Sequence, residues 1–324
     1  MKRFGLILLT LLALSCGPRG GKKEQQPQAR PFPMAEVPSM ITDPQERLVW
    51  VSAHFWDRFT DTSAFHAGDS TMINGVITED VEKQMGVFAT LLRSIELPVG
   101  EKAMTSLYER IETFQLAHPD GNLFQEMAGL ADKYFFDPNS PLRSEDLYLP
   151  FVSRMAESPL VPSAEKARYE WDKSTCSINR TGTPAADFTF VDSQGKTRTL
   201  YGIKAEYTLL IFGNPDCKAC KDLMEDMSAS DISALIYSGV LKVADIYIDE
   251  EIELWKERIA DYPNLWINGY DPNYSIRGDR IYAVRAVPSL YLLDKDKKVI
   301  LKDALPDDVL AALESILEDA VNAF

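Results

Sequence analysis

The spacing of apolar residues changes once along this chain, near Asn179, and the change limits what its two parts can fold into. Before it, apolar residues recur three and four positions apart, as in Leu48, Val51 and Phe55, which is typical of amphipathic helices. After it, short apolar runs alternate with helical stretches, as in layered α/β domains. The 324 residues suffice for two domains. We predict an all-helical domain over 37–178 and an α/β domain over 179–324.

The first part is predicted to hold five or six helices. Asp43 followed by Pro44 is a typical helix start, because Asp caps the first turn and Pro fits the first helical position. Turn-forming clusters such as His118-Pro-Asp-Gly separate the later helices. Those helices are predicted near Thr78, Leu107, Leu123, Asp146 and Ala164.

The second part is predicted to begin with a β-hairpin around Ser193-Gln-Gly-Lys. A buried strand over 207–212 then leads through Asn214-Pro-Asp into Cys217, and a helix is predicted from Lys218. Further along the chain we predict a short helix over 231–237, a strand over 241–248, a helix over 250–259, a hairpin over 289–301 and a closing helix over 307–323.

Two of the four cysteines form a Cys217-Lys-Ala-Cys220 motif where the predicted strand ends and the helix begins. The free N–H groups and the dipole of a helix N-terminus favour negative charge, so Cys217 should be stabilised as a thiolate. A thiolate is the attacking species in disulfide exchange. Cys220 lies one turn later and can resolve a mixed disulfide. Lys218 and Asp216 add opposite charges nearby, and the sequence leaves their net effect open.

Other uses of a CxxC motif must be weighed. It could supply half of a zinc site, but there is no second CxxC, and His54, His66 and His118 all lie in the helical part. A copper-delivery module would need a histidine in the second part. A peroxidase would need a hydroxyl shortly before Cys217. We therefore expect no metal and no cofactor, and a redox role for the motif.

A later segment, Val287-Pro288, precedes a predicted strand, where proline is unusual unless its peptide bond is cis or its position special. With the strand–CxxC–helix unit and the following hairpin, this segment resembles the thioredoxin fold. Gly182-Thr-Pro-Ala-Ala-Asp-Phe is similar to the opening of TlpA-like members. The resemblance implies that Val287 and Pro288 pack against the CxxC and receive the substrate backbone. The stretch from Phe55 resembles a helical domain of unknown function found before such modules.

The sequence departs from that family pattern near the motif. Asp216 replaces the usual Trp, and Lys218-Ala219 replaces the usual Gly-Pro or Pro-Pro. Ile211 stands where many thioredoxins carry a buried acid, and Leu223 stands where TlpA-like members often carry one. These changes leave the exchange chemistry possible but leave the proton donor, the redox potential and the substrate open.

The first residues have the pattern of an export signal. Lys2 and Arg3 precede an apolar run that ends in Ala13-Leu14-Ser15-Cys16, which resembles a bacterial lipobox. The resemblance implies a signal peptide over 1–15 and a lipid-anchored Cys16, and the alternative is an ordinary secreted signal. Residues 16–36 read as a flexible tether. We expect a lipoprotein of the cell envelope that faces the periplasm.

The formal net charge of −15 argues against a nucleic-acid partner, because phosphates would be repelled. We predict a membrane-tethered thiol–disulfide oxidoreductase that reduces or isomerises protein or small-molecule disulfides and is recharged by a membrane electron donor. The alternative is a non-catalytic binding lipoprotein whose CxxC is a structural disulfide and whose helical domain binds a partner. Cys176 could be a third redox group, but a buried free thiol is the simpler interpretation.

Overall fold

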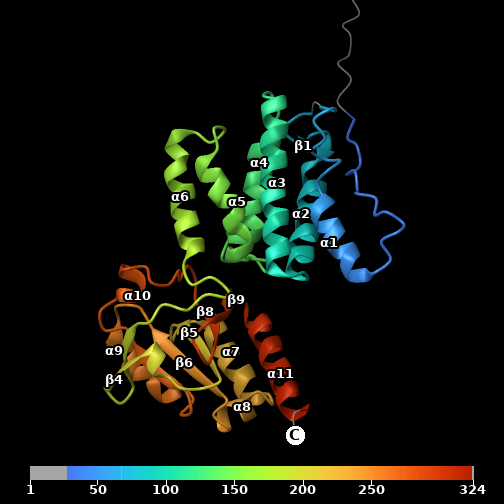
Figure 1. The fold of residues 1–324 in the computed structure, drawn as a ribbon. Helices are drawn as coiled ribbons and strands as arrows, with labels where there is room; N and C mark the ends of the chain where they lie inside the picture. The colour runs from blue at the N-terminus through green and yellow to red at the C-terminus, as the bar shows by residue number, and fades with distance from the viewer. Residues whose placement is uncertain (1–27, 67, 323–324) are drawn as a thin grey trace, which may run out of the picture.

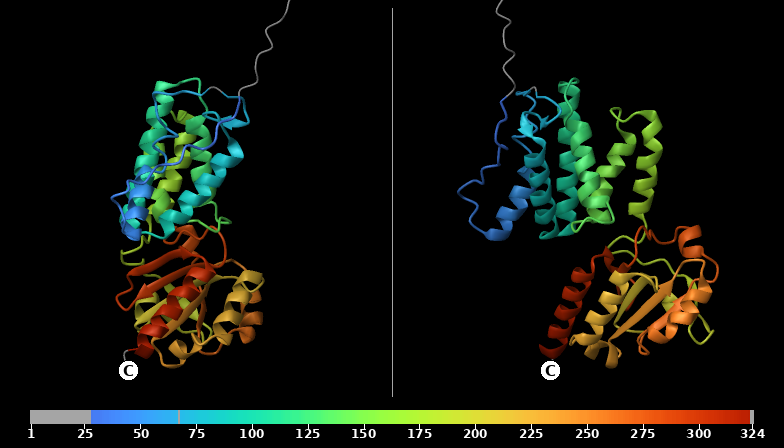
Figure 2. Two further views of the ribbon diagram at one scale, coloured as in Figure 1. Left: turned by 90° about the vertical axis from the view of Figure 1, so that its right-hand side faces the viewer. Right: turned by 180° about the vertical axis from the view of Figure 1, so that it is seen from behind.

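The computed structural model describes residues 28–66 and 68–322, in two parts stacked end to end (Figures 1 and 2). The predicted signal peptide and Cys16 lie outside the described residues. Among the residues described, no helix combines the length and the apolar character needed to cross a membrane.

The first part is built of helices, as predicted. Asp43 caps its first helix, because the Asp43 carboxylate accepts a hydrogen bond of 2.9 Å from the amide of Glu46. The six α-helices are α1 (Pro44–His54), α2 (Thr78–Arg93), α3 (Leu97–Ala117), α4 (Leu123–Ala131), α5 (Glu145–Glu157) and α6 (Ser163–Ser177). A turn of π-helix, η1 (Asp132–Phe136), continues α4. The strands β1 (Met72–Ile73) and β2 (Val76–Ile77) form a small hairpin that was not predicted, because two residues are too short to show a period.

The helices meet in one apolar core. Phe88 of α2, Ile111 of α3 and Phe151 of α5 are completely buried within it. Complete burial of side chains of this size stabilises the fold by roughly 2 kcal/mol each. The helical part therefore has a core of its own.

The second part is a seven-stranded mixed sheet in the order β4-β3-β7-β6-β5-β8-β9. The central strands β5, β6 and β7 are parallel, and every other pair is antiparallel. The strands are β3 (Thr189–Asp192), β4 (Thr197–Thr199), β5 (Tyr207–Gly213), β6 (Leu241–Tyr247), β7 (Ile267–Tyr270), β8 (Ser289–Asp294) and β9 (Val299–Ala304). Parallel neighbours place the carboxyl ends of β5 and β6 at one edge, where β5 leads into the CxxC.

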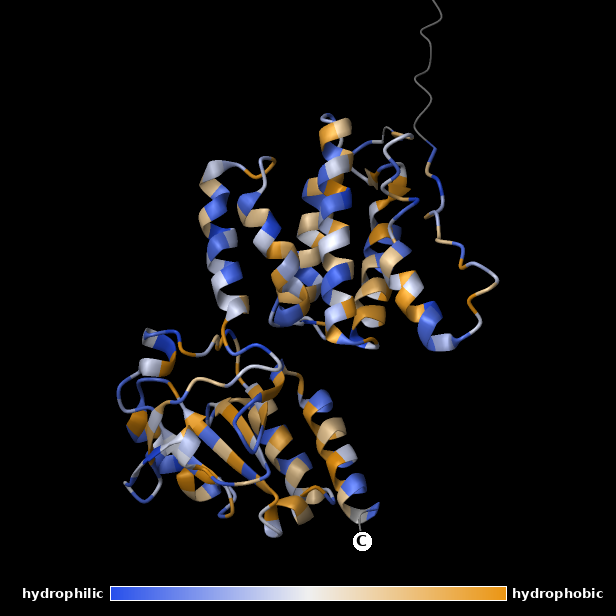
Figure 3. Cartoon of the chain, viewed as in Figure 1, coloured by the Kyte–Doolittle hydropathy of each residue, from blue (hydrophilic) through white to orange (hydrophobic). Residues whose placement is uncertain are grey.

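Both faces of the sheet are covered. Along β5, Leu209 and Ile211 pack on one face with α7, α8 and α11, whereas Leu210 and Phe212 belong to a second cluster on the other face. The central strands are accordingly hydrophobic along most of their length (Figure 3). The helices of this part are α7 (Lys218–Ala229), α8 (Ser233–Tyr237), α9 (Ile252–Arg258), α10 (Ser275–Gly278) and α11 (Pro306–Asn322), with the short 3₁₀ turns η2 (Leu200–Gly202) and η3 (Ile259–Asp261).

The predicted fold class, an α/β thioredoxin-like part preceded by a helical part, is confirmed. Strand β7 was missed, because its four residues include Asn268 and Gly269 and carry little strand signal. Helix α9 is shorter than predicted, since it begins two residues later, at Ile252, and a 3₁₀ turn takes over from Ile259.

Candidate active site

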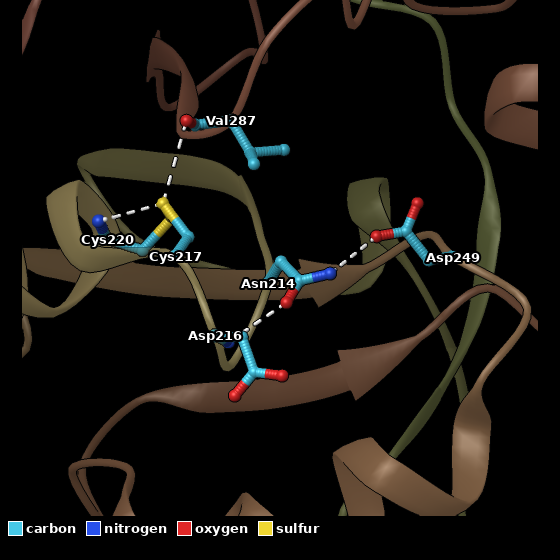
Figure 4. The surroundings of a disulfide bond; sticks show 6 residues. All are labelled: Asn214, Asp216, Cys217, Cys220, Asp249 and Val287. Atoms are coloured by element: carbon cyan, nitrogen blue, oxygen red, sulfur yellow. Dashed lines mark hydrogen bonds between the residues drawn. A yellow bond between two sulfur atoms is a disulfide. The ribbon is translucent and has the colours of Figure 1, made fainter.

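Cys217 and Cys220 lie at the N-terminus of α7 and are joined by a disulfide, with Cα atoms 5.3 Å apart (Figure 4). Cys217 is the N-cap of the helix, and its Sγ accepts a hydrogen bond of 3.1 Å from the amide of Cys220. The same amide would stabilise a thiolate on Cys217 after reduction. The geometry therefore suits Cys217 as the attacking group.

The loop before the motif is held by one amide side chain. Asn214 accepts a hydrogen bond of 2.9 Å from the amide of Asp216 and donates one of 2.7 Å to Asp249 (Figure 4). Asp249 is held in turn by Arg277 at 2.8 Å. These contacts fix the turn that presents Cys217.

Lys218 and Asp216 were expected to act on Cys217 with opposite charges. Lys218 instead pairs with Asp222 one turn later at 2.6 Å, and both side chains are exposed. The Asp216 carboxylate points away from the sulfur atoms (Figure 4). The helix N-terminus therefore dominates the electrostatics at Cys217.

The predicted proline segment lies against the motif. The Val287–Pro288 peptide bond is cis, and the carbonyl oxygen of Val287 is 3.6 Å from the Sγ of Cys217 (Figure 4). Pro288 is buried at the start of β8. The fold thus brings together two pairs of candidate residues separated by about 70 positions in the sequence.

A cavity of about 520 Å³ opens beside Cys220. Its wall is formed by α7, the loop before it, the end of β6 and the segment after α9. The residues that line it include Cys220, Met224, Asp245 and Tyr262. Cys220 and Asp245 therefore line one cavity.

Asp245 in this cavity was missed by sequence reasoning. It lies in the middle of β6 in register with Ile211, and it is only 6% exposed. A side chain at Gly213 would bring its Cβ within 3.0 Å of the Asp245 carboxylate, so glycine makes room for the acid. Burial raises the pKa of Asp245 to about 7. An acid flanked by Val243, Ala244 and Ile246 in a predicted strand was the available signal.

Cys176 is a completely buried free thiol at the end of α6, which confirms the simpler interpretation. Burial raises the pKa of the Cys176 thiol, so it is a poor nucleophile. Over residues 28–66 and 68–322, no three side chains of His, Cys, Asp or Glu are grouped so as to hold a metal ion.

Comparisons with known proteins found one family model and several solved structures that match this chain. A family described as "Domain of unknown function (DUF5106)" matches residues 15–179. A crystal structure of a thioredoxin-like protein from Bacteroides caccae is 32% identical, with a TM-score of 0.75, and the match covers 89% of this chain and 99% of that one. That similarity extends across both parts.

Two further crystal structures from Bacteroides fragilis match a portion of the chain. One, the C-terminal domain of an uncharacterized protein, is 44% identical over 42% of this chain and 98% of that one, with a TM-score of 0.41. The other, a conserved protein of unknown function, is 36% identical over 41% and 98%, with a TM-score of 0.40. No curated protein matches this chain.

Proposed function

The chain belongs to the thioredoxin-like proteins that carry an N-terminal DUF5106 domain, and on that premise we propose that it reduces or isomerises disulfides through Cys217 and Cys220. One observation carries the proposal. The Cys217–Cys220 disulfide caps a helix N-terminus and faces the Val287 carbonyl at 3.6 Å. Such an arrangement combines an activated thiolate with a backbone acceptor for an extended substrate.

The exchange proceeds in two steps from the reduced protein. The Cys217 thiolate attacks one sulfur of the substrate disulfide; that bond breaks, and the first substrate thiolate leaves and takes up a proton. The Cys220 thiolate then attacks the mixed disulfide, forms the Cys217–Cys220 bond and releases the second substrate thiol. Two electrons pass from the protein dithiol to the substrate, and an external dithiol must return them.

In the second step Cys220 must lose its proton. Asp245 lines the same cavity and titrates near neutral pH, so we assign it the role of accepting that proton. This carboxylate takes the place of the acid that is absent at Ile211 and Leu223.

We further propose that Cys16 is acylated and tethers the protein to a membrane of the cell envelope, facing the periplasm. Its substrates would be protein or small-molecule disulfides there, and a membrane dithiol protein would recharge it. The support is the lipobox-like Ala13-Leu14-Ser15-Cys16. Radiolabelled palmitate should enter the wild type but not Cys16→Ser, and equal labelling would refute the anchor.

A trapping experiment tests the redox function. Cys220→Ser should accumulate mixed disulfides with substrates, because the attacking thiolate remains and the resolving one is gone. Cys217→Ser should trap none and lose reductase activity. Non-reducing gels of the two variants, with thiols blocked at lysis, make the comparison directly.

A glutathione titration of the cysteine pair separates this function from the binding-protein alternative. A reversible couple near that of thioredoxin, about −270 mV, supports exchange. A bond that stays closed below about −300 mV is structural. That result, with no trapping by Cys220→Ser, would move the function to the helical part.

A further inference from the structure

Five charged side chains are buried where the two parts meet. Arg143 and Glu145 come from the start of α5 and the loop before it, and Arg285, Lys302 and Asp303 come from the sheet part. We call these five residues the interdomain charge cluster. Their side chains are between 1% and 16% exposed. Charged groups are rarely buried this deeply unless they are paired, so their arrangement constrains how the parts sit together.

Arg285 is the centre of the cluster. Its Nε donates a hydrogen bond of 2.9 Å to Glu145, and its Nη1 donates to the carbonyl oxygen of Phe136. The guanidinium carbon also lies 4.1 Å from the centre of the Phe136 ring. Arg285 lies two residues before Val287, at the start of residues 285–289, which we call the proline loop. The helical part therefore contacts this loop at its first residue.

The other end of the proline loop is tied to the same cluster. The Ser289 hydroxyl donates a hydrogen bond of 2.8 Å to Asp303. The second oxygen of Asp303 is 3.4 Å from Arg143 and 3.5 Å from Arg285. Both ends of the proline loop are therefore linked, through buried charges, to the helical part.

Glu145 is the link on which the cluster depends. Its two carboxylate oxygens face Arg285 and Lys302, each at 2.9 Å, and its side chain is 1% exposed. Lys302 also donates a hydrogen bond to the carbonyl oxygen of Cys176. The start of α5 and the end of α6 thus lie against β9 (Figure 1). A neutral side chain at position 145 would weaken the contact with Arg285.

We propose that the helical domain positions the substrate-binding loop of the redox site: Glu145, acting through Arg285, holds the Val287 carbonyl where a substrate backbone meets Cys217. The proposal rests on the proposed function. A loop ordered in advance lowers the entropy cost of binding an extended peptide. Glu145 and Arg285 are positioning residues, since neither touches the reacting sulfur atoms.

The test compares two reactions of reduced Glu145→Gln. One is reduction of a disulfide-bonded peptide, which needs the proline loop; the other is alkylation of Cys217 by iodoacetamide, which does not. The peptide reaction should slow roughly tenfold, mainly through KM, because a small displacement of a positioning group is costly. Alkylation should change less than about twofold, because the helix N-terminus is untouched. Equal slowing of both reactions would overturn the proposal.

Asp308→Asn is the matched control. Asp308 also joins the two parts, pairing with Arg93 at 2.6 Å; the pair lines the same pocket as Glu145, but it is partly exposed, and the other side-chain bond of Arg93 is to the carbonyl oxygen of Pro141. This variant should leave both reactions unchanged. Arg285→Lys keeps the charge but loses the planar fork, and it should reproduce Glu145→Gln if the latter folds poorly. The positioning role would be refuted if Glu145→Gln and Arg285→Lys reduced the peptide at the wild-type rate. It would also be refuted if Asp308→Asn slowed the peptide reaction as much as those two variants do.

Hydrogen exchange separates this proposal from the redox function itself. Amides of residues 283–290 should exchange faster in Glu145→Gln than in Asp308→Asn, whatever the activity. If the wild type reduces no peptide disulfide, the redox proposal fails while this exchange comparison still reports on the loop. Unchanged exchange in Glu145→Gln would show that the helical part does not hold it.

Discussion

At the scale of single residues, the pKa of Asp245 can be tested by measuring stability at different pH values. Its pKa is raised from an ordinary 3.8 to about 7 by burial, so the folded protein keeps this proton at pH values where the unfolded chain has lost it. The contribution to stability is complete at low pH and falls as pH rises from about 4 to about 7. The total loss is at most about 4 kcal/mol.

Asp245→Asn should remove that dependence. We expect the free energy of unfolding of the variant, minus that of the wild type, to rise between pH 4 and pH 7 and to level off above it. Urea unfolding at a series of pH values measures the difference, in which other titrating groups cancel. Parallel profiles would show that Asp245 does not titrate in this range.

The same variant reports on proton transfer when disulfide resolution is followed. Resolution of a mixed disulfide at pH 7 should slow by roughly 100-fold if Asp245 accepts the Cys220 proton. Asp222 is an exposed acid on α7, the helix that carries Cys220. Asp222→Asn is therefore the control, and it should react at the wild-type rate.

At the scale of elements, the first turn of α7 depends on Cys217 in two ways. Its sulfur takes part in the proposed reaction and also caps the helix. Serine is a good N-cap and alanine is a poor one. Cys217→Ser and Cys217→Ala should therefore be equally inactive, whereas the Ala variant should be less stable by about 1 kcal/mol.

Denaturant unfolding of these two variants isolates the cap, because both lack the disulfide. Equal stability would mean that the contact between Sγ and the Cys220 amide contributes nothing to the helix. Activity in Cys217→Ser would instead contradict the role of this sulfur as the attacking group.

At the scale of the whole molecule, the interdomain charge cluster should make the two parts interdependent. Arg285→Ala leaves the buried Glu145 and Asp303 with fewer cationic partners, and removing one member of a buried pair typically costs about 3 to 5 kcal/mol. Burial, and then Glu145, raise the pKa of Asp303 to about 6 although Arg143 and Arg285 act to lower it, so loss of Arg285 should raise this pKa further.

Calorimetry should therefore show a marked drop in Tm for Arg285→Ala and a small one for Asp308→Asn. The second pair is partly exposed, and pairs of that kind contribute at most about 1 kcal/mol. Equal drops in Tm for the two substitutions would mean that burial of the cluster does not add to the stability of the protein.

Much of the local structure could be predicted from short stretches of sequence. Apolar spacing gave the helices of the first part, and the Asp43-Pro44 start of α1 needs no distant partner. The position of Cys217-Lys-Ala-Cys220 after a buried strand indicated the reactive helix N-terminus. These features depend on residues within one or two turns of one another, so their physical causes can be read along the chain.

Contacts between residues far apart in the chain depend on how the strands and domains pack together. Asp245 reaches the redox site because β6 pairs with β5 in one register, Ile211 beside Asp245. Glu145 reaches Arg285 because α5 begins against the loop before β8. Strand order, register and domain docking arise from burial summed over many residues. No spacing within a single segment specifies them, so the sequence could mark Asp245 as an unusual strand residue but could not place it beside Cys220 or assemble the interdomain charge cluster.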